Sequence, residues 1–158
     1  MKIWNKEIIE EQMTLLEFIK DKVVISGGFA WHIISPPHIE NRLLHDHKDI
    51  DIYVFPNKFM ELITFLKEKG YKKTRTKYDG IDKDFYRYIK YEPKIILDVF
   101  VKEIPFIEVK GFNIVEPKFH LSLYEKTQTS KDCIAVKNAI KLIEKGISLI
   151  DHESLIDE

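Results

Sequence analysis

The chain has 158 residues, with 25 Lys and Arg against 26 Asp and Glu, so 25 − 26 gives a formal net charge of −1 with His neutral. This balance excludes broad electrostatic binding to polyanions, which calls for a basic surface. With 44% hydrophobic and 32% charged residues, the composition is that of a folded globular protein and not of a disordered one. A chain of about 150 residues buries about 70% of its unfolded surface, so we expect a single domain over 1–158.

The cellular location follows from features that the sequence lacks. No apolar stretch reaches the roughly 18 residues that a membrane span needs, and residues 1–7 do not contain the apolar run of a signal peptide. The single cysteine, Cys133, has no second cysteine with which to form an internal disulfide. We therefore expect a cytoplasmic protein that does not associate with membranes.

The first third of the chain combines helical and strand patterns. Apolar residues at intervals of three and four predict an amphipathic helix over 5–20. A β-branched run predicts a strand over 23–26, followed by a turn at Gly27-Gly28 and a short helix over 29–34. Residues 38–47, with three histidines and no apolar period, are expected to form an exposed loop.

Most of the remaining elements are strands. Strict alternation over 49–55 predicts a strand with one buried face, and Pro56 then opens a helix that Gly70 closes. β-favouring runs predict five more strands, over 71–77, 85–91, 94–102, 106–109 and 112–115. The second and third of these should be antiparallel neighbours, and the last two should form a hairpin. Pro117 and Ser130 are each expected to begin a C-terminal helix, the second ending near Gly146.

Two carboxylates share one face of the strand over 49–55. Alternation places Asp49 and Asp51 about 7 Å apart along that face, where they repel each other unless a cation lies between them. Mg²⁺ prefers carboxylate oxygens and often keeps phosphates as its other ligands, so the pair is a candidate site for phosphate chemistry. Considered alone, the pair has a commoner explanation as the solvated face of a half-buried strand.

A third carboxylate, Asp98, stands in an otherwise apolar strand. Burying it there requires a cation, a hydrogen-bond donor or contact with solvent. If this strand lies beside 49–55 with Asp98 on the same face, three carboxylates converge, enough to hold two metal ions about 4 Å apart. The alternative is a partly exposed position at the end of the sheet.

The segment Ser26-Gly27-Gly28 joins a strand to a helix. Glycines there let backbone N–H groups and the helix N-terminus approach a triphosphate, although most such pairs only make a tight turn. Lys126 and Lys131 could add positive charge for the triphosphate, while each is also explained as an ordinary surface lysine.

Two further groups of residues have a plainer interpretation beside a functional one. The loop with His38, His45 and His47 contains no cysteine, so zinc binding is disfavoured. The aromatic residues over 85–91 are explained as core, with an acceptor platform on one face as the alternative.

In combination these motifs resemble the nucleotidyltransferase superfamily of the DNA polymerase β type. The matching segments are Gly27-Gly28-Phe29-Ala30, His47-Lys48-Asp49-Ile50-Asp51-Ile52 and Leu97-Asp98-Val99. Within the superfamily the chain is most similar to the small aminoglycoside and lincosamide nucleotidyltransferases, whose pattern reads Gly-Gly-x-Ala and then Arg-x-His-x-Asp-[Ile/Leu]-Asp. His45 stands in the position of that Arg. The resemblance extends over residues 20–145.

The resemblance implies an α+β fold, with a mixed β-sheet flanked by helices over about 20–115 and a C-terminal helical part over 117–146. It also implies transfer of a nucleoside monophosphate from an NTP, with ATP expected, to a hydroxyl of a small molecule or protein, with release of pyrophosphate. The implied site residues are Asp49, Asp51 and Asp98 for catalysis and for two Mg²⁺ ions, and Ser26, Gly27, Gly28 and Lys131 for the nucleotide.

A second function is compatible with the same residues. A non-catalytic nucleotide-binding module, or a regulatory partner of the toxin–antitoxin type, would keep the fold without turnover. The retention of all three aspartates favours the enzyme. A nucleic-acid partner is disfavoured by the net charge, whereas a homodimer or a partner protein could complete an acceptor pocket.

Overall fold

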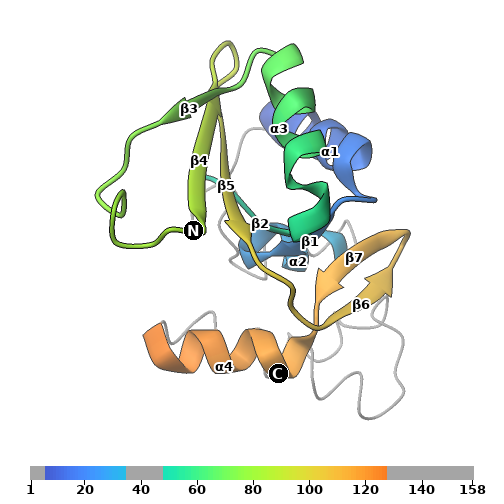
Figure 1. Ribbon diagram of the computed structural model, residues 1–158. Helices are drawn as coiled ribbons and strands as arrows, with labels where there is room; N and C mark the ends of the chain where they lie inside the picture. The colour runs from blue at the N-terminus through green and yellow to red at the C-terminus, as the bar shows by residue number, and fades with distance from the viewer. Residues whose placement is uncertain (1–5, 35–47, 128–158) are drawn as a thin grey trace.

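The structure, a computed structural model, describes residues 6–34 and 48–127. These residues form a seven-stranded mixed sheet of order β3-β4-β5-β2-β1-β7-β6 (Figure 1). The strands are β1 (Val23–Ser26), β2 (Ile50–Val54), β3 (Lys72–Thr74), β4 (Phe85–Lys90), β5 (Ile95–Val101), β6 (Phe106–Val109) and β7 (Phe112–Val115). The helices are α1 (Lys6–Ile19), α2 (Gly27–Ile34), the 3₁₀ turn η2 (Pro56–Lys58), α3 (Phe59–Glu68) and α4 (Pro117–Thr127). The predicted α+β class is confirmed.

Strand β2 lies at the centre of the sheet and positions the candidate site. It pairs in parallel with β5 and antiparallel with β1, while β4 pairs antiparallel with β5 as the sequence predicted. The predicted hairpin is β6–β7, and its turn is made by Lys110 and Gly111, both at positive φ, as a tight two-residue connection requires.

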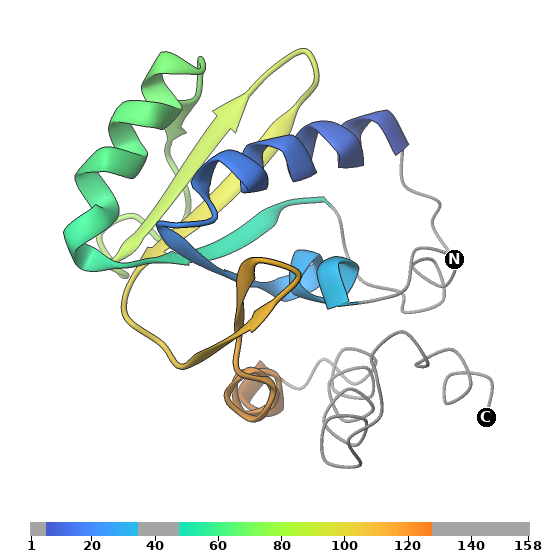
Figure 2. The ribbon, with the colours of Figure 1, turned by 90° about the vertical axis from the view of Figure 1, so that its right-hand side faces the viewer.

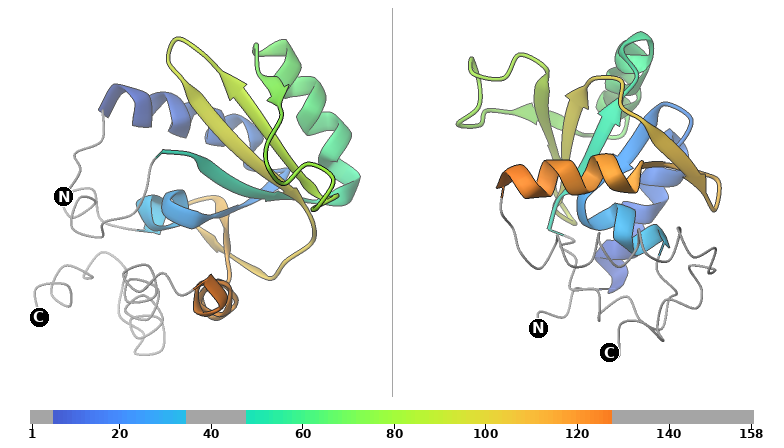
Figure 3. Two further views of the ribbon diagram at one scale, coloured as in Figure 1. Left: turned by 90° about the vertical axis from the view of Figure 1, so that its left-hand side faces the viewer. Right: turned by 90° about the horizontal axis from the view of Figure 1, so that it is seen from below.

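Helices cover both faces of the sheet. Figure 2 shows α1 and α3 on one side and α2 and α4 on the other, and Figure 3 shows α4 beneath the sheet on the side of α2. Strand β2 turns its isoleucines toward α1 and α3, and Ile50 and Ile52 are fully buried together with Leu16, Ile19 and Leu62. Because side chains alternate along a strand, the aspartates of β2 face the side of α2 and α4.

Several predicted bounds differ from the observed ones. The expected turn at Gly27-Gly28 does not exist as a separate element, because α2 begins directly at Gly27 and the chain changes direction within that residue, whose φ is +62°. The strand expected over 71–77 is limited to Lys72–Thr74.

Some expectations concern residues outside the described ranges. The loop over 38–47 and the helix from Ser130 to Gly146 both lie there. Within 6–34 and 48–127, no helix is long and apolar enough to span a membrane.

Candidate metal and nucleotide site

A row of polar residues crosses four neighbouring strands of the sheet. Ser26 on β1 pairs with Asp51 on β2, Asp51 pairs with Asp98 on β5, and Asp98 pairs with Arg87 on β4. Residues that are directly paired on neighbouring strands project from the same face of the sheet. Asp49, two residues before Asp51, projects from that face as well.

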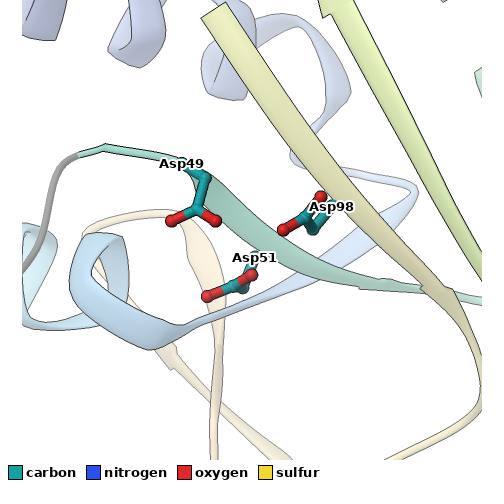
Figure 4. A group of neighbouring side chains, drawn as sticks. All are labelled: Asp49, Asp51 and Asp98. Carbon is teal, nitrogen blue, oxygen red and sulfur yellow. The ribbon is translucent and has the colours of Figure 1, made fainter. Parts of the chain in front are cut away.

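The three aspartates converge, as a shared metal site requires. One carboxylate oxygen from each of Asp49, Asp51 and Asp98 lies within 4.8 Å of the others. Figure 4 shows the carboxylates turned toward one another, two from the β2 end and one from β5. Asp98 is 5% exposed, and the other two are half-buried. An all-oxygen donor set of this kind fits a hard divalent cation such as Mg²⁺.

Arg87 is a member of this cluster that the sequence did not reveal. Its Nε and Nη2 donate hydrogen bonds to Oδ1 and Oδ2 of Asp98 at 2.7 and 2.9 Å, and Nη2 lies 3.8 Å from Oδ2 of Asp49. The hydrogen bonds to Asp98, with the negative charges nearby, raise the pKa of the Arg87 guanidinium. The aromatic strand that neighbours the Asp98 strand contains two cations, Arg87 and Lys90, and no local pattern distinguishes one from the other.

Gly27 brings the backbone of α2 against Asp51. A Cβ on Gly27 would overlap Oδ2 of Asp51, and the positive φ is also one that glycine adopts without strain. The contact places the N-terminus of α2 beside the carboxylate cluster. The first turn of a helix carries partial positive charge, which is favourable next to carboxylates.

Helix α4 contacts the start of α2 through a buried histidine. The N–H of Gly27, a residue that the family resemblance assigned to the nucleotide, donates a hydrogen bond to Nε2 of His120 at 3.3 Å. Burial lowers the pKa of His120 to about 3, so the imidazole is neutral and, with Nε2 accepting, carries its proton on Nδ1. No local pattern in the sequence singles out His120, because its partner lies far away along the chain.

The solved structures that resemble this chain include the following two. One is a lincosamide antibiotic adenylyltransferase, LnuA, with lincomycin bound, at a TM-score of 0.54 and 15% identity over 86% of this chain and 96% of that one. The other is the Megavirus polyadenylate synthase, at a TM-score of 0.53 and 16% identity over 93% of this chain and 37% of that one. The chain has the nucleotidyltransferase fold. No protein-family model matches the sequence, and no curated protein matches it significantly.

The nucleotidyltransferase fold predicted from the three motifs is therefore confirmed, while the roles of the site residues stay predictions. Ser26 is buried opposite Asp51, and Gly28 is half-buried in the first turn of α2. Lys131 and the three loop histidines lie outside the described residues, as does the side chain of Lys126.

An aromatic row lies next to the polar row on this nucleotidyltransferase sheet. Tyr53, Phe100 and Phe85 each lie two residues from Asp51, Asp98 and Arg87, on the same face. The ring centroids of Tyr53 and Phe100, and of Phe100 and Phe85, are 5.1 Å apart. One face of the aromatic strand therefore borders the cluster, while the other packs toward α3, where Tyr86 contacts Phe59.

Proposed function

We propose that the protein is a metal-dependent nucleotidyltransferase. It transfers a nucleoside monophosphate from an NTP to a hydroxyl of a small-molecule or protein acceptor and releases pyrophosphate. The observation that carries the proposal is the convergence of Asp49, Asp51 and Asp98 beside the N-terminus of α2, in a chain with the nucleotidyltransferase fold.

The proposed roles follow from the chemistry of the residues. Asp49, Asp51 and Asp98 would hold divalent metal, with two ions expected, and the metal would neutralise phosphate charge during the displacement. Gly28 and the N-terminal turn of α2 would receive the triphosphate, next to Ser26. A bond forms between the acceptor oxygen and the α-phosphorus, the bond to pyrophosphate breaks, and Asp98 accepts the hydroxyl proton.

The names of the similar structures support ATP as the donor. One is an adenylyltransferase and the other a polyadenylate synthase, so both are named for adenylate transfer. This chain spans 96% of the first and 37% of the second. With a net charge of −1, it also lacks the basic balance typical of proteins that bind long nucleic acids. We therefore favour a small acceptor or a protein hydroxyl, held against the aromatic row.

The first test is the thermal stability of the wild type and of Asp51→Asn, with and without Mg²⁺ and each of the four NTPs. A ligand at about a hundred times its dissociation constant stabilises the fold by about 2.7 kcal/mol. We expect Mg-ATP to raise the melting temperature of the wild type and of the control Asp21→Asn, which alters an exposed aspartate outside the cluster. It should not raise that of Asp51→Asn. The proposal would be overturned if no NTP changed the melting temperature of any of the three proteins.

One observation favours a second candidate, a nucleotide-binding module without turnover. Both oxygens of Asp98 accept hydrogen bonds from Arg87, and the Gly27 N–H donates one to His120, so a proposed catalytic carboxylate and one N–H group at the start of α2 already have partners. Release of pyrophosphate from Mg-ATP in the presence of acceptors separates the two candidates. The module would be favoured if the wild type binds Mg-ATP but releases pyrophosphate no faster than Asp98→Asn does.

A further inference from the structure

We propose that Arg87 is an exchangeable counterion of the three-aspartate cluster. Without ligand it holds Asp98 and weakens the binding of a divalent cation alone, and it transfers to the polyphosphate when metal and nucleotide bind together. This inference rests on the proposed function, since it concerns how that site is loaded. Arg87 would thereby couple the binding of the metal to the binding of the triphosphate.

The position of the Arg87 guanidinium explains why it would weaken the binding of metal alone. Its Nη2 lies between two carboxylates of the cluster, 2.9 Å from Oδ2 of Asp98 and 3.8 Å from Oδ2 of Asp49. A cation bridging Asp49 and Asp98 would therefore lie close to a permanent positive charge. Repulsion between the two cations lowers the affinity for metal whether or not the hydrogen bonds to Asp98 survive.

The Arg87 side chain can change partners while its backbone stays in place. The backbone of Arg87 is held in the β4–β5 ladder, directly opposite Asp98, so an exchange requires no movement of the strand. The Arg87 side chain is 31% exposed, whereas that of Asp98 is 7% exposed. The guanidinium of Arg87 is therefore in contact with solvent, and this long flexible side chain can turn from the carboxylate toward a bound ligand.

The chemistry of the Arg87 guanidinium suits a polyphosphate as well as a carboxylate. Its planar fork binds phosphate oxygens in the same bidentate manner as it binds the Asp98 carboxylate, so one group serves both partners. A triphosphate bound with its metal brings negative charge that offsets the repulsion between metal and arginine. Metal and polyphosphate are therefore expected to bind more tightly together than the metal binds alone.

A purely positioning role would reverse the effect on metal. If Arg87 only oriented Asp98 for coordination, its loss would weaken the binding of metal with or without polyphosphate. The exchange proposal instead requires opposite signs: tighter binding of metal alone, and weaker binding of metal with polyphosphate. The two roles are thus separated by binding measurements that need neither an acceptor nor turnover.

The experiment compares the wild type with Arg87→Gln, which removes the charge, and Arg87→Lys, which keeps the charge without the fork. Arg75→Gln, at an exposed arginine just after β3, is the matched control for loss of one positive charge. Mn²⁺ binding is measured by electron paramagnetic resonance, first alone and then with inorganic tripolyphosphate. Circular dichroism confirms that each variant is folded.

We expect Arg87→Gln to bind Mn²⁺ alone about tenfold more tightly and Mn²⁺ with tripolyphosphate about tenfold more weakly, as fits the loss of one charge-assisted pair. The affinities of Arg87→Lys for Mn²⁺ should lie between those of Arg87→Gln and the wild type in both conditions. This second variant keeps the test decisive if Arg87→Gln is unfolded. Arg75→Gln should match the wild type. Weaker binding of Mn²⁺ in both conditions, or no change in either, would overturn the exchange. A wild type that binds neither Mn²⁺ nor Mg-NTP would instead overturn the proposed function.

Discussion

Asp98 is a carboxylate within an otherwise buried strand, and its surroundings explain how the fold accommodates it. The sequence required a cation, a donor or solvent for this residue. The structure supplies the forked hydrogen bonds from Arg87, directly across the β4–β5 ladder. Residue by residue, the three aspartates were predictable as a candidate cluster because alternation and an isolated charge are local patterns. Arg87 was not, because its role depends on the register between two strands.

The Arg87–Asp98 pair should be worth more than an exposed ion pair of this protein. In a double-mutant cycle with Arg87→Ala and Asp98→Ala, we expect a coupling free energy of about 1–3 kcal/mol in denaturant unfolding, because Asp98 is buried and the contact is bidentate. The control cycle is Lys58→Ala with Glu61→Ala, an exposed pair at 3.7 Å, for which about 0.5 kcal/mol or less is expected. Equal coupling in the two cycles would contradict this account of Asp98.

At the scale of elements, the junction of β1 and α2 determines how closely backbone approaches the carboxylates. The strand passes into the helix within one residue, Gly27, whose missing side chain leaves room for Asp51. The sequence predicted a strand, a glycine pair and a helix in that order. It did not predict which glycine was required, because the requirement comes from a contact with another strand.

Gly27→Ala should therefore disturb both the fold and the site. Alanine at this φ costs about 1–2 kcal/mol, and its Cβ would also displace Asp51. The control is Gly70→Ala, where φ is +89° and no atom lies within 4 Å of an added Cβ. We expect both variants to lose stability in urea unfolding, Gly27→Ala by more. Stabilisation by Mg-ATP should disappear only in Gly27→Ala, and its survival there would show that Asp51 had not been displaced.

At the scale of the whole molecule, α4 is joined to the site through His120. The helix follows the β6–β7 hairpin in sequence, yet its buried imidazole accepts the hydrogen bond of the Gly27 N–H at the start of α2. The contact connects the C-terminal side of the described chain to the carboxylate cluster. Because the imidazole is buried and neutral, the stability of this arrangement depends on pH.

Acidification should destabilise the wild type more than His120→Gln, whose amide oxygen can accept the same hydrogen bond without titrating. The folded-state pKa of His120 is about 3, below its ordinary value of 6.5, so between these values the unfolded state binds a proton that the folded state does not. Stability is fully present above pH 6.5 and falls as pH decreases toward 3. From pH 7.5 to 5.5 the wild type should lose about 1.4 kcal/mol more than the variant in urea unfolding. Equal losses would contradict a buried, neutral His120.

The sequence by itself determined the periodic elements, the face that Asp49 and Asp51 share, and the family of folds that their motifs resemble. Those properties follow from local periodicity and from short motifs. Only the tertiary structure decided that Asp51 lies beside Asp98, that Arg87 neutralises Asp98, and that His120 reaches Gly27. Each of these depends on strand register or helix packing between segments distant in sequence, and a shift of one residue in register would turn the side chains to the opposite face.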